Sequence, residues 1–144
     1  MMKLTLDSIE DWDLTWFAYD DNGNIAVFFS NGTRLVLIDN ILKEDNYSEA
    51  IDYFDSLPNI NQYHDNNQSN IHQKSNSIYS DDIDSYIKKG LFIYDIVNPT
   101  NPIYSLVASP EYPIFISNID MSIKYKIEKF NGVFTEEINI EPVL

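Results

Sequence analysis

The hydrophobic pattern at the start of this chain is that of β-strands. Residues 14–20 (LTWFAYD) and 25–29 (IAVFF) are rich in aromatic and β-branched side chains, and the connection 21–24 (DNGN) contains an Asn-Gly pair. Strand formers on both sides of a short Asn-Gly connection predict a β-hairpin. A second Asn-Gly pair at 31–32 precedes the β-branched run 33–38, which predicts a third strand in a meander.

Between residues 46 and 57 the apolar spacing becomes helical. Five apolar side chains fall on one face, while the acidic residues lie elsewhere. Asn46 and Glu49 are spaced for a capping box, and Pro58 is expected to end the helix. The apolar positions are Tyr47, Ala50, Ile51, Phe54 and Leu57.

A second, shorter helix is predicted over residues 81–89. Ser80 can serve as its N-cap, and Gly90 follows at the position where helices commonly end. Asp81 and Asp82 fall in the first turn and two lysines fall in the last, which is the charge order that suits the helix dipole. Between the two helices, residues 59–80 are mostly Asn, Gln, Ser, His and Asp, and we expect a long mobile polar loop there.

The β pattern returns in the last third of the chain. Residues 91–96 and 103–108 predict a second hairpin with a longer, Pro-containing loop. Residues 119–130 fit a helix or a strand, with the helix slightly favoured, and a last strand is possible through Ile138 and Ile140. The sequence therefore predicts a single α+β domain over residues 1–144, with an antiparallel sheet of two hairpins packed with two or three short helices.

Charge narrows the range of partners. The chain has 144 residues, of which 9 are Lys or Arg and 23 are Asp or Glu, for a formal net charge of -14. Such a surface repels nucleic acid and anionic membranes and attracts a cationic protein; the alternative is that the charge only maintains solubility. The chain has no cysteine, no signal peptide pattern and no transmembrane run, so we expect a cytoplasmic protein.

Candidate chemistry is sparse. His64 and His72 lie in the polar loop, eight residues apart, which matches no common metal-ligand spacing. Residues 20–24 (DDNGN) offer oxygen ligands beside a glycine, but a hairpin turn explains them better than a calcium loop does. No nucleophile elbow, phosphate-binding loop or zinc-protease motif is present. We therefore expect no enzyme, no cofactor and no metal.

Several segments resemble small immunity proteins encoded beside bacterial polymorphic and contact-dependent toxins. The resemblance rests on residues 16–20 (WFAYD), 23–28 (GNIAVF), 53–58 (YFDSLP), 90–95 (GLFIYD) and 104–110 (YSLVASP), with Pro113-Ile114 beyond. It implies a cytoplasmic protein that binds one cognate toxin and neutralises it without chemistry of its own. If the toxin is a nuclease, carboxylates would occupy the site of its anionic substrate.

We expect the toxin to bind at the acidic start of the second helix. Asp81, Asp82 and Asp84 would point outward while the apolar side chains of that helix anchor it to the sheet. Asp11 and Asp13 form a second acidic candidate near the amino terminus. In the alternative, Asp81 and Asp82 serve only the helix dipole, at about 0.3–1 kcal/mol each. The competing functions are a structural or adaptor protein of a phage or mobile element and an enzyme acting on a small polar substrate.

Overall fold

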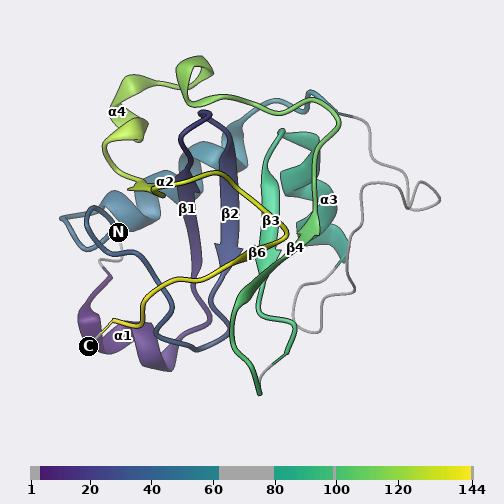
Figure 1. Cartoon of the computed structure of the whole chain (residues 1–144). Helices are drawn as coiled ribbons and strands as arrows, with labels where there is room; N and C mark the ends of the chain where they lie inside the picture. Colours follow the sequence, from purple (N-terminus) through teal and green to yellow (C-terminus); the bar gives the residue numbers. More distant parts are fainter. Residues whose placement is uncertain (1–3, 62–79, 99, 144) are drawn as a thin grey trace.

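The computed structural model describes residues 4–61, 80–98 and 100–143, apart from the side chains at positions 10, 11, 80 and 81. These residues form an α+β fold (Figure 1). The helices are α1 (Leu6–Asp11), α2 (Asn46–Ser56), α3 (Ser80–Lys88) and α4 (Met121–Lys124), with a 3-10 turn η2 (Ile116–Asn118). The strands are β1 (Thr15–Tyr19), β2 (Ile25–Phe29), β3 (Phe92–Asp95), β4 (Tyr104–Ala108), β5 (Glu128–Lys129) and β6 (Glu137–Ile138).

The six strands form one mixed sheet in the order β5-β1-β2-β3-β4-β6. Both predicted hairpins are present, since β1 pairs antiparallel with β2 and β3 pairs antiparallel with β4. The prediction of a purely antiparallel sheet is wrong, because β3 lies parallel to β2, with Ala26 opposite Phe92, and β5 lies parallel to β1. The connection from β2 to β3 contains α2 and α3, and a helical crossover of this kind returns the chain in the same direction.

Alternate residues of the central strands enter two separate cores, one on each face of the sheet. Trp16 and Phe28 belong to the first core, which we call core 1; Phe17 and Val27 belong to the second, core 2. All of β2 is buried, as expected of a strand covered on both faces. Core 1 is closed by α1, the segment 35–41 and the carboxyl-terminal residues, which cross in front of the sheet in Figure 1. Core 2 is closed by α2, α3 and α4.

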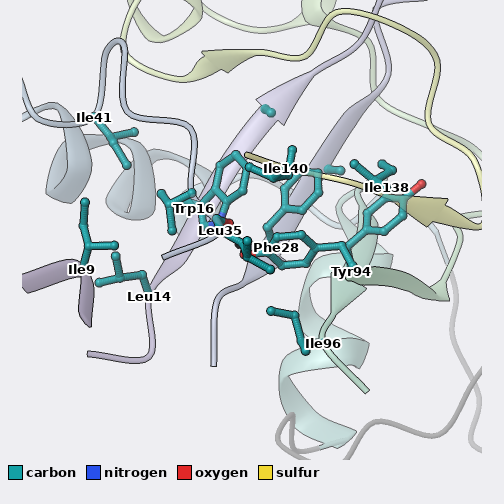
Figure 2. Close-up of a cluster of buried hydrophobic side chains, with 14 of the residues drawn as sticks. Ile9, Leu14, Trp16, Phe28, Leu35, Ile41, Tyr94, Ile96, Ile138 and Ile140 are labelled. Carbon is teal, nitrogen blue, oxygen red and sulfur yellow. Dashed lines mark hydrogen bonds between the residues drawn. The ribbon is translucent and has the colours of Figure 1, made fainter. Parts of the chain in front are cut away.

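Aromatic rings dominate core 1. Figure 2 shows Trp16, Phe28 and Tyr94 side by side, from three neighbouring strands. The Trp16 and Phe28 rings stack with centroids 4.3 Å apart, and those of Phe28 and Tyr94 stack at 5.0 Å. The Trp16 indole N–H donates to the Tyr104 hydroxyl at 3.1 Å, and that hydroxyl donates to the Leu35 carbonyl at 2.7 Å. The polar atoms carried into this core therefore find partners.

The segment 33–38, predicted as a third strand, forms no strand. Leu35 and Val36 are buried in core 1, so the apolar run covers a face of the sheet and does not pair at its edge. The segment is fixed by the Leu35 carbonyl, which accepts from Tyr104, and by the Arg34 carbonyl, which accepts from the Val143 main-chain N–H at 2.8 Å. A run of β-branched and apolar residues is therefore compatible with a buried covering segment as well as with a strand.

Residues 119–130 contain both of the structures between which the pattern was ambiguous. The helix α4 begins after Asp120, whose carboxylate accepts from the Ser122 main-chain N–H at 3.2 Å, and the chain then extends into β5. Ile123 and Ile127 both reach core 2. A spacing of four suits the helix and the short extended stretch alike, which is why the sequence fitted both.

The two predicted longer helices are confirmed, with differences at their ends. The predicted N-cap of α2 is wrong by one residue, since Asp45 occupies that position without a side-chain cap bond and Asn46 is the first helical residue. Glu49, which the predicted capping box used, pairs with Lys126. α3 begins at Ser80 itself. Most of the polar loop predicted at 59–80 lies outside the described residues. Among the described residues, no helix has the length and apolar character needed to cross a bilayer.

Candidate protein-binding face

Two helices lie against the same face of the sheet and bring together acidic segments that are far apart in the sequence. α2 contributes Ala50 and Phe54 to core 2, and α3 contributes Ile83 and Ile87. Each helix is amphipathic, so burying its apolar side turns its acidic side outward. The arrangement of the acidic residues therefore follows from the packing of the two helices.

The carboxyl-terminal ends of α2 and α3 are joined by hydrogen bonds around Asp55. The Lys89 ammonium group donates to the Asp55 main-chain carbonyl at 2.6 Å, where it also offsets the negative end of the α2 dipole. The Tyr86 hydroxyl donates to the Asp55 carboxylate at 3.3 Å. Lys89 and Tyr86 are both buried, so these contacts fix the position of one helix relative to the other.

Four carboxylates lie on the solvent side of this helix pair. We call them the acidic helical face, which consists of Asp52, Asp55, Asp82 and Asp84. Asp52, Asp55 and Asp82 are exposed. Asp52 lies three residues before Asp55, which puts both on the same side of α2. The Asp84 side chain is 32% exposed and pairs with Lys88 at 2.9 Å, one turn further along α3.

Carboxylates from both helices affect the pKa of Tyr86. Burial raises the pKa of the Tyr86 phenol first, followed by the charge of Asp55, its hydrogen bond to Asp55 and the charge of Asp82. The phenol therefore stays protonated and remains a donor to Asp55. Asp55 on α2 and Asp82 on α3 therefore both favour the protonated form of this phenol.

An open hollow of about 460 Å³ lies between the end of α2 and the outer side of α3. Its lining mixes both charges, with Asp55 and Asp84 opposite two lysines. A hollow of this kind suits a polar side chain from a protein partner better than an apolar ligand. The lining residues are Asp55, Leu57, Pro58, Asn59, Asp84, Ser85, Lys88 and Lys89.

The structure separates the predicted site residues into two groups. Asp82 and Asp84 lie on α3 over core 2, and Asp81 belongs to the same helix, although its side chain is outside the description. Asp11 ends α1, which packs on core 1 at the other face of the sheet, and its side chain is likewise not described. Asp13 is exposed, and its carboxylate accepts from the Asn31 main-chain N–H at 2.7 Å. The two acidic candidates therefore do not form one surface.

Asp52 and Asp55 were missed as site residues by the sequence reasoning. The signal was present, because the helical spacing at 46–57 already set them off from the apolar face. The proximity of Asp55 to α3 is a tertiary contact that the spacing along α2 does not predict. The two histidines, His64 and His72, lie outside the described residues, and within the described part of the chain no group of three His, Asp or Glu side chains could hold a metal ion.

No protein-family model matches this chain, and neither the curated proteins nor the solved structures include a match.

Proposed function

We propose that this chain is an immunity protein: it binds a cationic toxin encoded beside it and occludes the toxin's active site, with no catalytic activity or cofactor of its own. The observation that carries the proposal is the acidic helical face, in a chain with a net charge of -14. The resemblance of several segments to such immunity proteins supports the same function.

The helix pair suits binding because its carboxylates stand on rigid elements. The hydrogen bonds from Tyr86 and Lys89 to Asp55 hold the two helices together before any partner arrives. A surface that is already ordered loses less conformational entropy on binding than a loop does, which leaves more of the interaction energy as affinity. Exposed carboxylates can also accept paired N–H donors from arginine in a fixed geometry.

A toxin whose substrate is anionic carries positive charge at its active site, and this is the feature that an acidic inhibitor can recognise. The long-range attraction between the two surfaces accelerates encounter, and close charge pairs at an interface have measured couplings of about 1.5–7 kcal/mol. Carboxylates that take the place of substrate phosphates would block access without any chemical step. Nucleic acid and anionic membranes remain unfavourable partners for the same electrostatic reason.

A structural or adaptor protein of a phage or mobile element is the second candidate. The side chains of Tyr112, Phe115, Met121 and Tyr125 are large, apolar and exposed. They would favour an assembly function where they adjoin one another, because contiguous apolar patches mark contacts between proteins. In that case the acidity would serve solubility. The two functions differ in the genes expected next to this one: a toxin for the first, capsid or tail proteins for the second.

The test is co-expression with the adjacent toxin in a cell that the toxin kills. The unmodified chain should restore growth, and a variant with Asp52→Asn, Asp55→Asn, Asp82→Asn and Asp84→Asn should not. A control variant with Asp7→Asn, Glu111→Gln, Glu136→Gln and Glu141→Gln removes the same charge from exposed positions elsewhere and should still protect. A folded, abundant wild-type protein that leaves toxicity unchanged would rule out the immunity function.

A further inference from the structure

Three of the four glycines in this chain follow an asparagine, at Asn22-Gly23, Asn31-Gly32 and Asn131-Gly132. In such a pair the main-chain nitrogen of the glycine can attack the asparagine side-chain amide, because no side chain on the glycine shields it. The chain therefore contains three copies of one reactive dipeptide, and the fold decides how freely each can react.

The first pair is held in the β1–β2 turn. The Gly23 N–H donates to the Asp20 main-chain carbonyl at 3.0 Å, and the Asn22 N–H donates to the Asp20 carboxylate at 3.0 Å. A Cβ built on Gly23 would stand 3.4 Å from the Ile116 side chain, so the turn is also packed from outside. Attack by the Gly23 nitrogen requires breaking its hydrogen bond and distorting this turn.

The second pair is open. Asn31 is exposed, and no heavy atom lies within 4 Å of a Cβ position built on Gly32. Within the described residues, the Gly32 N–H donates no hydrogen bond. Asn31 has φ 55°, in the left-handed region that Asn adopts more readily than other residues with a Cβ. The turn is closed by the Thr33 N–H, which donates to the Ser30 carbonyl at 3.0 Å, and the Asn31 N–H donates to the Asp13 carboxylate. Among the described residues, however, no hydrogen bond or packing contact holds the attacking Gly32 nitrogen itself.

The third pair is intermediate. The Gly132 carbonyl accepts from the Asp21 main-chain N–H at 2.9 Å, and a Cβ built on Gly132 would lie 3.3 Å from the Phe130 ring. Asn131 itself is exposed. The main chain is thus tied on one side of the pair and packed on the other.

We propose that Asn31 is the preferred site of spontaneous deamidation in the folded protein. The Gly32 nitrogen loses its proton and bonds to the Asn31 side-chain carbonyl carbon, and the side-chain nitrogen leaves as ammonia, which gives a five-membered succinimide. Water then opens the ring at either carbonyl and produces aspartate or isoaspartate. No oxidant or reductant takes part, and the sole co-reactant is water.

The modification acts on the contact that closes the open end of the first hairpin. The Asn31 main-chain N–H donates to the Asp13 carboxylate, and next to it the Ser30 N–H donates to the Leu14 carbonyl at 2.9 Å. Either product puts a new carboxylate beside Asp13, and isoaspartate also lengthens the main chain by one carbon. Both changes oppose the Asp13 contact and are independent of the proposed toxin binding.

The test compares the three pairs within one protein. The folded chain is incubated in weakly alkaline buffer, digested, and each Asn-Gly peptide is followed by mass spectrometry for the replacement of NH2 by OH. Asn31 should react about tenfold faster than Asn22, which corresponds to about 1.4 kcal/mol, the upper range of one main-chain hydrogen bond. Asn131 should fall between them.

A parallel incubation in urea separates structure from sequence. In the unfolded chain the three pairs should react at comparable rates, because the contacts that distinguish them are gone. The proposal is overturned if Asn31 reacts no faster than Asn22 in the folded protein, or if the same ratio persists in urea.

Discussion

Substitution of Asp20 should lower the free energy of unfolding markedly, because its carboxylate is buried and fully used in hydrogen bonds. Asp20 is 2% exposed at the end of β1, and its carboxylate accepts three main-chain hydrogen bonds. One oxygen takes the N–H groups of Asn22 and Asn24, at 3.0 and 2.9 Å, and the other takes that of Phe134 at 2.9 Å. The Phe134 ring stacks on Phe130 and packs against core 1, so Asp20 joins the turn to the carboxyl-terminal cover.

The substitutions Asp20→Ala and Asp20→Asn should give different losses. Hydrogen bonds to a charged group contribute about 1.5–3 kcal/mol each. The alanine variant loses all three bonds, but Asn22 is exposed and its N–H can bond to water again. Two uncompensated bonds remain, so we expect a loss of about 3–6 kcal/mol in the free energy of unfolding. The asparagine variant keeps the two bonds in the turn, but its NH2 group, a donor, faces the Phe134 N–H, which is also a donor. The free energy of unfolding should therefore fall by about 1.5–3 kcal/mol.

Urea unfolding, followed by the fluorescence of buried Trp16, measures both losses. The neighbouring Asp21→Asn variant is the control: Asp21 is exposed and pairs with Lys129 at 2.6 Å, and surface pairs of this kind contribute below about 1 kcal/mol. A loss below about 1 kcal/mol for Asp20→Ala, on the same scale, would refute the role assigned to this carboxylate. So would an alanine variant that is more stable than the asparagine variant.

Three further predictions concern other parts of the molecule. Gly90→Ala should lower the free energy of unfolding by more than Gly32→Ala. Both positions have positive φ, where an alanine is strained by about 1–2 kcal/mol, but only at Gly90 would the new Cβ also meet the Ile114 nitrogen, at 2.6 Å. Equal losses in urea unfolding would contradict the packing argument. Glu128 accepts main-chain N–H bonds from residues 40 and 41, and burial, outweighing those bonds, raises its pKa above 4.5. The folded state therefore holds this proton more tightly than the unfolded state does. The free energy of unfolding of the wild type, relative to that of Glu128→Gln, should fall as pH rises from 4.5 through the raised pKa. A relative stability that rises over this pH range would show that the pKa is lowered. Raising the salt concentration should slow association with the toxin more than it speeds dissociation, and a salt-independent association rate in stopped-flow measurements would indicate an apolar interface.

Local signals predicted the elements that depend on nearby residues. The first hairpin, α2, α3 and the strand pair β3–β4 all form close to where the spacing, turns and caps put them. What the sequence pattern did not decide was the order of strands. The pairing of Ala26 with Phe92 joins residues from opposite sides of a helical crossover, and that crossover was itself a sign of parallel strands.

The candidate site was predictable in part for the same reason. The acidic start of α3 was visible as charge ahead of an amphipathic helix, and the acidic side of α2 was visible as residues off its apolar face. Their meeting depends on the contacts of Tyr86 and Lys89 with Asp55, which are made between segments more than 30 positions apart. Asp13 shows the opposite case, since the carboxylate expected to face a partner accepts a main-chain hydrogen bond from Asn31.

The most direct test of the account is the affinity of the purified adjacent toxin for the two charge variants. Both variants remove four negative charges and therefore reduce long-range attraction alike. The variant on the acidic helical face also loses the Asp84–Lys88 ion pair, while Asn at position 55 keeps an oxygen that can accept from Tyr86, so its free energy of unfolding is measured beside its affinity. We expect the variant at Asp52, Asp55, Asp82 and Asp84 to bind more than about tenfold more weakly than the control, a difference of at least about 1.4 kcal/mol. Equal affinities, with both variants folded, would contradict the claim that this face binds the toxin.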